Sequence, residues 1–195
     1  TEGTALEREP VLYERDGYAV AKWWQERIVR RAAERDGLDL TVLRPGFVWG
    51  PGNELVDGVG QRLGRLQLVF APAGRLPLTH VENCADCFAA AVGSGAAVGA
   101  TLNVVDGDAP RTWLYARDAG AGLLRLPVPY ALAYGLVRVV HRTARAVLGE
   151  RMKVPSIFVP RRFEARFKPV RASGAEARRV LGWRPPLEYK DALRR

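Results

Sequence analysis

Apolar and polar positions follow two different periods along the first part of the chain. Residues 18–35 carry apolar side chains at helical spacing and end at Asp36-Gly37, so we expect a helix there. The run LDLTVLRPG comes next. It is rich in aliphatic residues and stops at Pro45 and Gly46, which predicts a strand. A helix that leads directly into a strand is typical of α/β proteins.

The same alternation continues to residue 110. We expect a helix over residues 56–66, a short strand in LQLVF, a helix in HVENCADCFAAAV and a strand in TLNVVDG. The apolar side chains that the cysteine-containing helix should bury are Val81, Ala85, Phe88 and Val92. Strands separated by helices predict a parallel sheet that is covered by helices on both faces.

From residue 112 onward the pattern is mostly helical, with loops that contain PVP, VPSIFVP and WRPP. The segment 128–148 has a basic side with His141, Arg142 and Arg145. Its apolar side consists of Tyr130, Ala131, Tyr134, Val137, Val140 and Leu148. We expect this helix to face the core, although it could instead cover an apolar substrate or lie on an anionic membrane surface.

Composition indicates one ordinary globular domain. The chain has 195 residues, of which 48% are hydrophobic, and no uncharged apolar run approaches the roughly 18 residues that a membrane span needs. The formal net charge is +9, but the arginines alternate with acids, as in QERIVRRAAERDG, which favours a solvated helix face. Because no nucleic-acid-binding motif accompanies this charge, we expect no nucleic-acid partner.

Cys84 and Cys87 form a single C-x-x-C. A structural zinc site needs four ligands, and the only histidines are His80 and His141, so we expect no metal. The cysteines lie in an apolar helical pattern, which favours thiols that pack in the core over a redox pair. Two unlinked thiols suit a reducing cytoplasm, which is the location we expect.

A tyrosine and a lysine stand four residues apart in the first predicted helix. Tyr18 and Lys22 therefore share one helix face. A neighbouring cation favours the phenolate form of a tyrosine, so the phenol can serve as a general acid or base where a carbinol and a carbonyl interconvert. Glu26 follows one turn later, where a helix salt bridge with an arginine such as Arg30 is at least as good an explanation as a role in the site.

Further motifs follow this pair in a fixed order. YAVAKWWQE is followed by TVLRPGFVWGPGNE, LPLTHVENCADCFAAAV, TLNVVDGDAPRT and ASGAEARRVLGWRPPLEYKDAL. In this order they resemble the extended short-chain dehydrogenase/reductase family, whose members are also called NAD-dependent epimerases and dehydratases, with a 3β-hydroxysteroid dehydrogenase-like branch as one possibility. The resemblance is strongest over residues 1–110 and 171–195 and looser between them.

The resemblance implies a fold and a cofactor. We expect an α/β fold: residues 1–110 would be the second half of a Rossmann-type doubly wound parallel sheet with inserted substrate-binding segments. Residues 111–195 would be a mostly helical substrate-binding and C-terminal region. The implied cofactor is NAD or NADP, and the implied assembly is a homodimer formed through the helix that carries Tyr18.

The resemblance also assigns site residues. Tyr18 would transfer the proton, and Lys22 would favour its phenolate form and hold the nicotinamide ribose. The backbone of Pro45 and Gly46 would border the nicotinamide, where a residue without a side chain permits close approach, and Phe47 and Val48 would continue this wall. A plain strand-ending turn is the alternative explanation for Gly46.

Other parts of the family pattern are missing from the sequence. No G-x-x-G-x-x-G phosphate loop and no matching catalytic Ser or Thr occur, and the first residue is Thr1. We therefore expect a fragment or truncated chain whose cofactor-phosphate half lies upstream. The alternative is a non-catalytic remnant that keeps only the substrate half of the fold.

The substrate is a small molecule of one of two classes. Leu76 and Pro77 stand where sugar-nucleotide epimerases have an arginine and an aspartate. Together with the apolar segment 128–148, this favours an apolar alcohol or ketone over a nucleotide-sugar. The candidate substrate-binding residues are Asn53, Arg62, Arg75 and Arg145.

Overall fold

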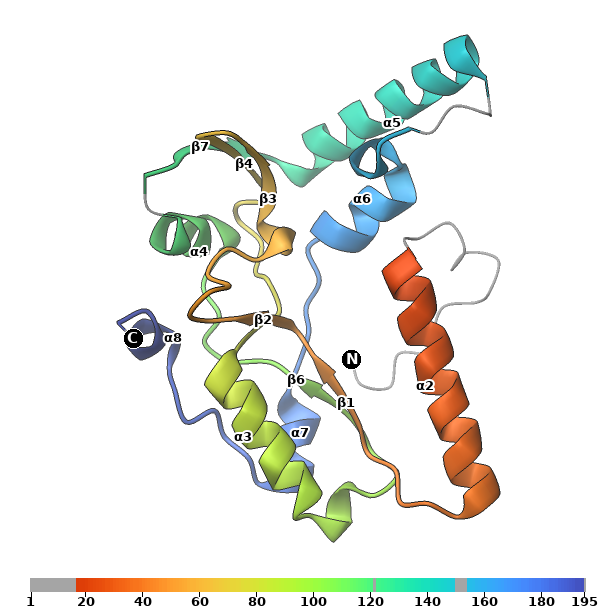
Figure 1. Cartoon of the computed structure of the whole chain (residues 1–195). Coiled ribbons are helices and arrows are strands. Elements are labelled where there is room, and N and C mark those ends of the chain that lie inside the picture. The colour runs from red at the N-terminus through yellow and green to blue at the C-terminus, as the bar shows by residue number, and fades with distance from the viewer. Residues whose placement is uncertain (1–16, 121, 150–153, 195) are drawn as a thin grey trace.

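The computed structural model describes residues 17–120, 122–149 and 154–194 (Figure 1). Its elements are, in chain order, α2 (Gly17–Asp36), β1 (Val42–Pro45), β2 (Phe47–Trp49), η1 (Asp57–Val59), β3 (Gly60–Leu63), β4 (Leu66–Phe70), β5 (Leu78–His80), α3 (Val81–Val92), η2 (Gly95–Ala97), β6 (Thr101–Val104), α4 (Thr112–Ala119), β7 (Leu124–Val128), α5 (Tyr130–Leu148), η3 (Ser156–Phe158), α6 (Pro160–Phe167), α7 (Ala175–Leu181) and α8 (Tyr189–Ala192).

Two pairs of parallel strands lie in the middle of the molecule. β1 pairs with β6, with Val42 opposite Thr101, and β2 pairs with β5, with Phe47 opposite Leu78. The helix α3 connects β5 to β6, and α2 leads into β1, so helices and strands alternate in the way that crossover units require (Figure 1). The predicted α/β class with parallel strands is confirmed.

A second sheet was predicted only in part. The strand LQLVF is confirmed as β4, but the helix expected over residues 56–66 is wrong, because this segment forms η1 and then β3, antiparallel to β4. Gly58, Gly60 and Gly64 disfavour a helix here, and a Cβ at position 60 would lie 1.8 Å from the carbonyl oxygen of Leu68 on β4. The unforeseen strand β7 pairs in parallel with β4.

The helix expected around the cysteines is confirmed as α3, but its buried face was predicted wrongly. The buried residues are Asn83, Cys87 and Ala91, whereas Val81 and Ala85 are exposed. Phe88 is also exposed, and Val92 is 91% exposed. The small side chains of the buried face let the helix approach the strand β6, which the apolar pattern alone did not indicate.

Both cysteines pack in the core as free thiols, as the apolar pattern predicted. Cys87 is fully buried in a cluster with Leu102, Val104, Ala177 and Trp183. Burial raises the pKa of Cys87 to about 11, and burial also raises the pKa of Cys84. The two thiols therefore stay protonated at neutral pH.

The helix predicted near residues 128–148 is confirmed as α5. It packs on α6 in an aromatic cluster whose buried members are Phe70, Ala133, Val137, Phe163 and Phe167. Of the expected apolar side, Val137 is buried, while Tyr130, Tyr134 and Val140 are half-buried and Ala131 is exposed. The side chain of Leu148 lies outside the described part of the structure.

Candidate active site

The predicted site residues meet at a cleft between α2 and the strands β1 and β2. Its volume is about 910 Å³, and its walls include Tyr18, Lys22, Pro45, Gly46 and Val48. The helix supplies the phenol and the ammonium, and the strands supply the backbone at the opposite wall. Residues that are nearly thirty positions apart in the sequence thus share one cavity.

Tyr18 and Lys22 lie one helical turn apart near the start of α2. The Lys22 Nζ lies 5.7 Å from the centroid of the Tyr18 ring, within the range of a cation–π contact. Tyr18 is 72% exposed, and Lys22 is also exposed. Among the described residues Lys22 forms no ion pair with an acid, so its ammonium group is available to a ligand in the cleft.

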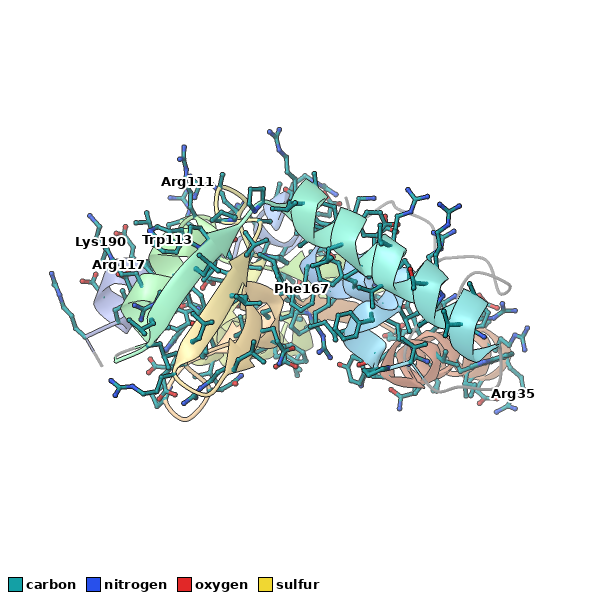
Figure 2. The ribbon with its side chains drawn as sticks, turned by 90° about the horizontal axis from the view of Figure 1, so that it is seen from above. Arg35, Arg111, Trp113, Arg117, Phe167 and Lys190 are labelled. Atoms are coloured by element: carbon teal, nitrogen blue, oxygen red, sulfur yellow. The ribbon has the colours of Figure 1, made fainter. Side chains whose placement is uncertain are left out.

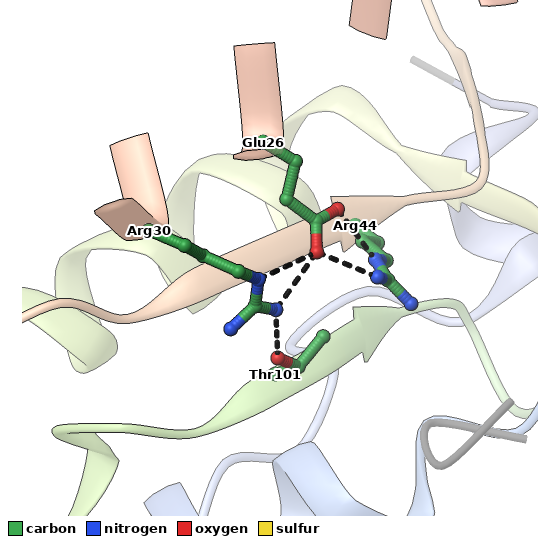
Figure 3. Close-up of polar contacts among 4 residues, drawn as sticks. All are labelled: Glu26, Arg30, Arg44 and Thr101. Carbon is green, nitrogen blue, oxygen red and sulfur yellow. Dashed lines mark hydrogen bonds and ion pairs between the residues drawn. The ribbon is translucent and has the colours of Figure 1, made fainter. Parts of the chain in front are cut away.

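Glu26, the next acid on this face of α2, is held by two arginines (Figure 3). Its Oε1 accepts hydrogen bonds from the Nη2 atoms of Arg30 at 2.8 Å and of Arg44 at 2.7 Å. Arg30 also donates to Thr101 Oγ1 on β6 at 2.7 Å. The predicted Glu26–Arg30 pair is confirmed, and the partners on β1 and β6 are additional findings.

This network has two consequences. It joins α2 to β1 through the ion pair of Glu26 with Arg44, and to β6 through the hydrogen bond from Arg30 to Thr101. It also decides the charge of Glu26: burial raises the pKa of this carboxyl, but the hydrogen bonds from Arg44 and Arg30 outweigh burial and lower the pKa below its ordinary value. Since Glu26 is already neutralised by these arginines, it does not compete for the ammonium of Lys22.

Gly46 lies where β1 passes into β2, and its packing leaves no room for a side chain. A Cβ at this position would lie 2.1 Å from the carbonyl oxygen of Pro77 and 3.0 Å from Val105 Cγ1. The neighbouring amide of Phe47 donates to the same Pro77 oxygen at 2.6 Å. The glycine is therefore required by the protein's own packing, whether or not a ligand also approaches it.

Replacing Gly46 with alanine should lower the free energy of unfolding by about 1–3 kcal/mol, because the backbone of Pro77 must move to admit the methyl group. Urea-induced unfolding measures this loss. The matched control is Gly135→Ala on α5, where a Cβ would meet no atom within 4 Å, so the control should gain up to about 1 kcal/mol. Equal effects of the two substitutions would contradict the packing argument.

Two predicted residues near this wall have other surroundings. Phe47 lies outside the cleft and packs beside Gly58 and Leu76 at the edge of the core, because side chains alternate between the faces of a strand. Asn53 is exposed, and its Nδ2 donates to the carbonyl oxygen of Val48 at 2.8 Å. Asn53 thus holds the turn that follows β2.

The three predicted substrate-binding arginines are not brought together. Arg75 lines a second cavity of about 900 Å³ with Arg111 and Arg171. The two cavities are neighbours, because Gly46 of the first packs directly on Pro77 and Val105, which line the second. Arg62 on β3 and Arg145 on α5 are exposed and line neither cavity.

A buried polar cluster around Asp106 was missed by sequence reasoning. The Asp106 carboxylate accepts hydrogen bonds from the His80 amide at 2.7 Å and from Asn83 Nδ2 at 3.0 Å. Asn83 also bonds to the backbone of Leu187 in both directions, at 2.9 Å each. Burial raises the pKa of Asp106 to about 6, even though these hydrogen bonds lower it. The sequence offers little signal, because His80 and Asn83 stand in the largely polar stretch THVEN and Asp106 ends the apolar run NVVD.

Comparison with known proteins shows the family of this chain. The model of the family described as NAD dependent epimerase/dehydratase family matches residues 2–127. A search of curated protein sequences gave no match.

Solved structures with the same fold include RMD from Pseudomonas aeruginosa complexed with NADPH, at 20% identity and a TM-score of 0.56, covering 92% of this chain and 54% of that one. UDP-glucuronic acid 4-epimerase from Bacillus cereus, in complex with UDP-glucuronic acid and NAD, is 15% identical with a TM-score of 0.55, covering 91% and 50%. The terminal R domain of the myxalamid biosynthetic pathway is 23% identical with a TM-score of 0.59, covering 98% and 50%.

These structures share the fold of this chain, and the chain spans about half of their length. The family model matches more than half of the 195 residues and includes the whole cleft that carries Tyr18, Lys22 and Gly46. The chain belongs to the NAD-dependent epimerase/dehydratase family.

Proposed function

We propose that this chain carries the proton-transfer part of an NAD(P)-dependent enzyme that oxidises a carbinol centre or reduces a carbonyl centre, as a dehydrogenase, epimerase or dehydratase. The observation that supports the proposal is the shared cleft, into which α2 presents Tyr18 and Lys22 opposite the backbone of Pro45 and Gly46. Membership in an NAD-dependent family supports the choice of cofactor.

The residues of the cleft suit the nicotinamide end of a dinucleotide. When bound, the cofactor would supply or accept a hydride. The Tyr18 hydroxyl would donate a proton to the substrate oxygen, or its phenolate would remove one. The Lys22 ammonium would favour that phenolate and donate hydrogen bonds to ribose hydroxyls, which its lack of an acidic partner among the described residues allows.

The pyrophosphate of the cofactor needs different residues. Dinucleotide-binding folds hold it at a glycine-rich turn that opens a helix, and the 195 residues contain no G-x-x-G-x-x-G or G-x-G-x-x-G. We therefore assign this contact to residues outside this chain and expect activity from a polypeptide that contains both parts.

The cavities bear on the class of substrate. The sequence favoured an apolar alcohol or ketone, partly because of the apolar residues in segment 128–148, but no residue of α5 lines either of the two cavities. The second cavity is instead lined by three arginines, Arg75, Arg111 and Arg171, which outnumber the two aspartates of its lining, Asp106 and Asp108. Guanidinium groups suit phosphate oxygens, so this cavity favours an anionic substrate such as a nucleotide-sugar.

The experiment uses a full-length polypeptide that contains these residues and follows the absorbance of the reduced nicotinamide, or product formation for a redox-neutral reaction. NAD and NADP are each combined with UDP- and dTDP-sugars and with sterol and isoprenoid alcohols. We expect turnover of a nucleotide-sugar, with a KM that rises about tenfold or more in Arg75→Gln and Arg111→Gln. Arg62→Gln, an exposed arginine that lines neither cavity, is the matched control.

Two results would change the proposal. Turnover confined to apolar alcohols would overturn the anionic substrate and leave the proton-transfer pair in place. The absence of both cofactor binding and turnover, with every substrate of the panel, would instead favour the non-catalytic alternative.

A further inference from the structure

The helix α5 exposes a second apolar face that its packing does not use. The exposed apolar side chains are 61% to 75% accessible to solvent and are Leu132, Leu136, Val139 and Val147. Their spacing of four, three and eight residues places them on one face. The face that packs against α6 is a different one, because it carries the buried Ala133 and Val137.

A row of arginines borders this exposed apolar face. Arg138, Arg142 and Arg145 follow one another at intervals of four and three residues, and the helix contains no acidic residue. All three are exposed, and Arg138 and Arg142 form no ion pair with an acid in the part of the chain that the structure describes. The exposed surface of α5 is therefore apolar on one side and positively charged on the adjacent side.

The strand β7, which precedes α5, exposes two further apolar side chains. Leu124 and Leu126 are exposed, while Arg125 between them reaches the carbonyl oxygen of Ala116 on α4 at 2.8 Å. Since side chains alternate along a strand, the two leucines lie on the side of the sheet away from α4. Figure 1 shows β7 and α5 along the same upper side of the molecule, and Figure 2, which looks onto that side, shows them following one another.

The charge pattern decides between the occupants that such a surface could have. A second copy docked by two-fold symmetry with the two α5 helices antiparallel would bring the arginine row of one helix towards the same row of the other, without an acid on either helix to compensate. An anionic lipid surface offers both complements, because acyl chains accept the apolar side chains and headgroup phosphates accept the arginines. None of the described helices has the length and apolar character needed to cross a bilayer.

We propose that the apolar face of α5 formed by Leu132, Leu136, Val139 and Val147, together with the arginine row of the same helix, binds the surface of a membrane that contains anionic phospholipids. The 19-residue helix lies parallel to the membrane plane, along about 28 Å, while α6 keeps it attached to the domain. The cleft of Tyr18 takes no part in this contact, so the proposal does not depend on the catalytic function.

The test is sedimentation of the 195-residue chain with vesicles of phosphatidylcholine alone, and with vesicles of phosphatidylcholine and phosphatidylglycerol in equal parts. We expect binding to the anionic vesicles that weakens as salt is added. The double variant Arg138→Gln/Arg142→Gln should bind about 25-fold more weakly, at roughly fivefold for each arginine. The triple variant Leu132→Gln/Leu136→Gln/Val139→Gln should lose on the order of tenfold or more.

The controls carry the same changes elsewhere on the surface. Val92→Gln on α3 and Arg184→Gln remove an exposed apolar and an exposed basic side chain, and they should leave vesicle binding unchanged. Because all substituted side chains are exposed, circular dichroism should show intact folding in every variant. Equal binding to both kinds of vesicle, loss of binding in the controls, or a dimer that the triple variant dissociates would overturn the proposal. The last outcome would assign the surface to a second copy of the chain.

Discussion

Replacing Tyr18 with phenylalanine should lower turnover by about a thousandfold while changing cofactor affinity little, because positioned proton transfer contributes roughly 10²–10⁴ in rate. The substitution removes one oxygen atom and keeps the ring that lies 5.7 Å from Lys22 Nζ. Tyr18 is 72% exposed, so the loss of the hydroxyl should not affect folding. The measurement compares kcat and the dinucleotide Kd in the full-length polypeptide.

Two further variants distinguish the role of the Tyr18–Lys22 pair from effects of other residues. Lys22→Ala should weaken both turnover and cofactor affinity, since its ammonium is proposed to contact the ribose as well as the phenol. Tyr134→Phe, on α5 in the aromatic cluster that this helix shares with α6, is a matched control that should retain activity. Full activity of Tyr18→Phe would refute the assignment of Tyr18, whatever the substrate proves to be.

Replacing Asp106 with asparagine should change the pH dependence of stability. Burial raises the pKa of Asp106 from an ordinary 3.8 to about 6, so the folded state binds this proton more tightly than the unfolded state. The resulting stabilisation is fully present below the ordinary pKa and is lost as the pH rises through about 6. Relative to wild type, Asp106→Asn should therefore gain about 3 kcal/mol between low and neutral pH.

The difference between the two unfolding profiles is the quantity to measure, because Glu26 and other carboxyls contribute their own pH dependence to both proteins. Loss of a hydrogen bond from His80 or Asn83 adds a constant offset that does not change the slope. Asp108 raises the pKa of Asp106, so Asp108→Asn should move the transition to lower pH. Parallel profiles for wild type and Asp106→Asn would contradict the assignment of a buried, ionising carboxyl.

The elements that the sequence predicted correctly are those with a strong local pattern. The structure has a helix where the apolar spacing of residues 18–35 predicted one. It also has strands at the aliphatic run before Pro45 and at LQLVF, as predicted. The helical spacing also placed Tyr18 and Lys22 on one face, which is a property of the five helical residues 18–22 alone. Three glycines within seven positions should have argued against the helix over residues 56–66.

The tertiary structure decided which partner each side chain meets. It brought Glu26 to Arg44, packed Gly46 against Pro77, gathered His80, Asn83 and Asp106 into one buried cluster, and left a second apolar face of α5 in contact with solvent. The physical reason is that helical and strand periods depend on neighbours within one turn or one pleat. The choice among many chemically equivalent partners for a buried charge or an apolar face depends on which distant elements the chain brings alongside it.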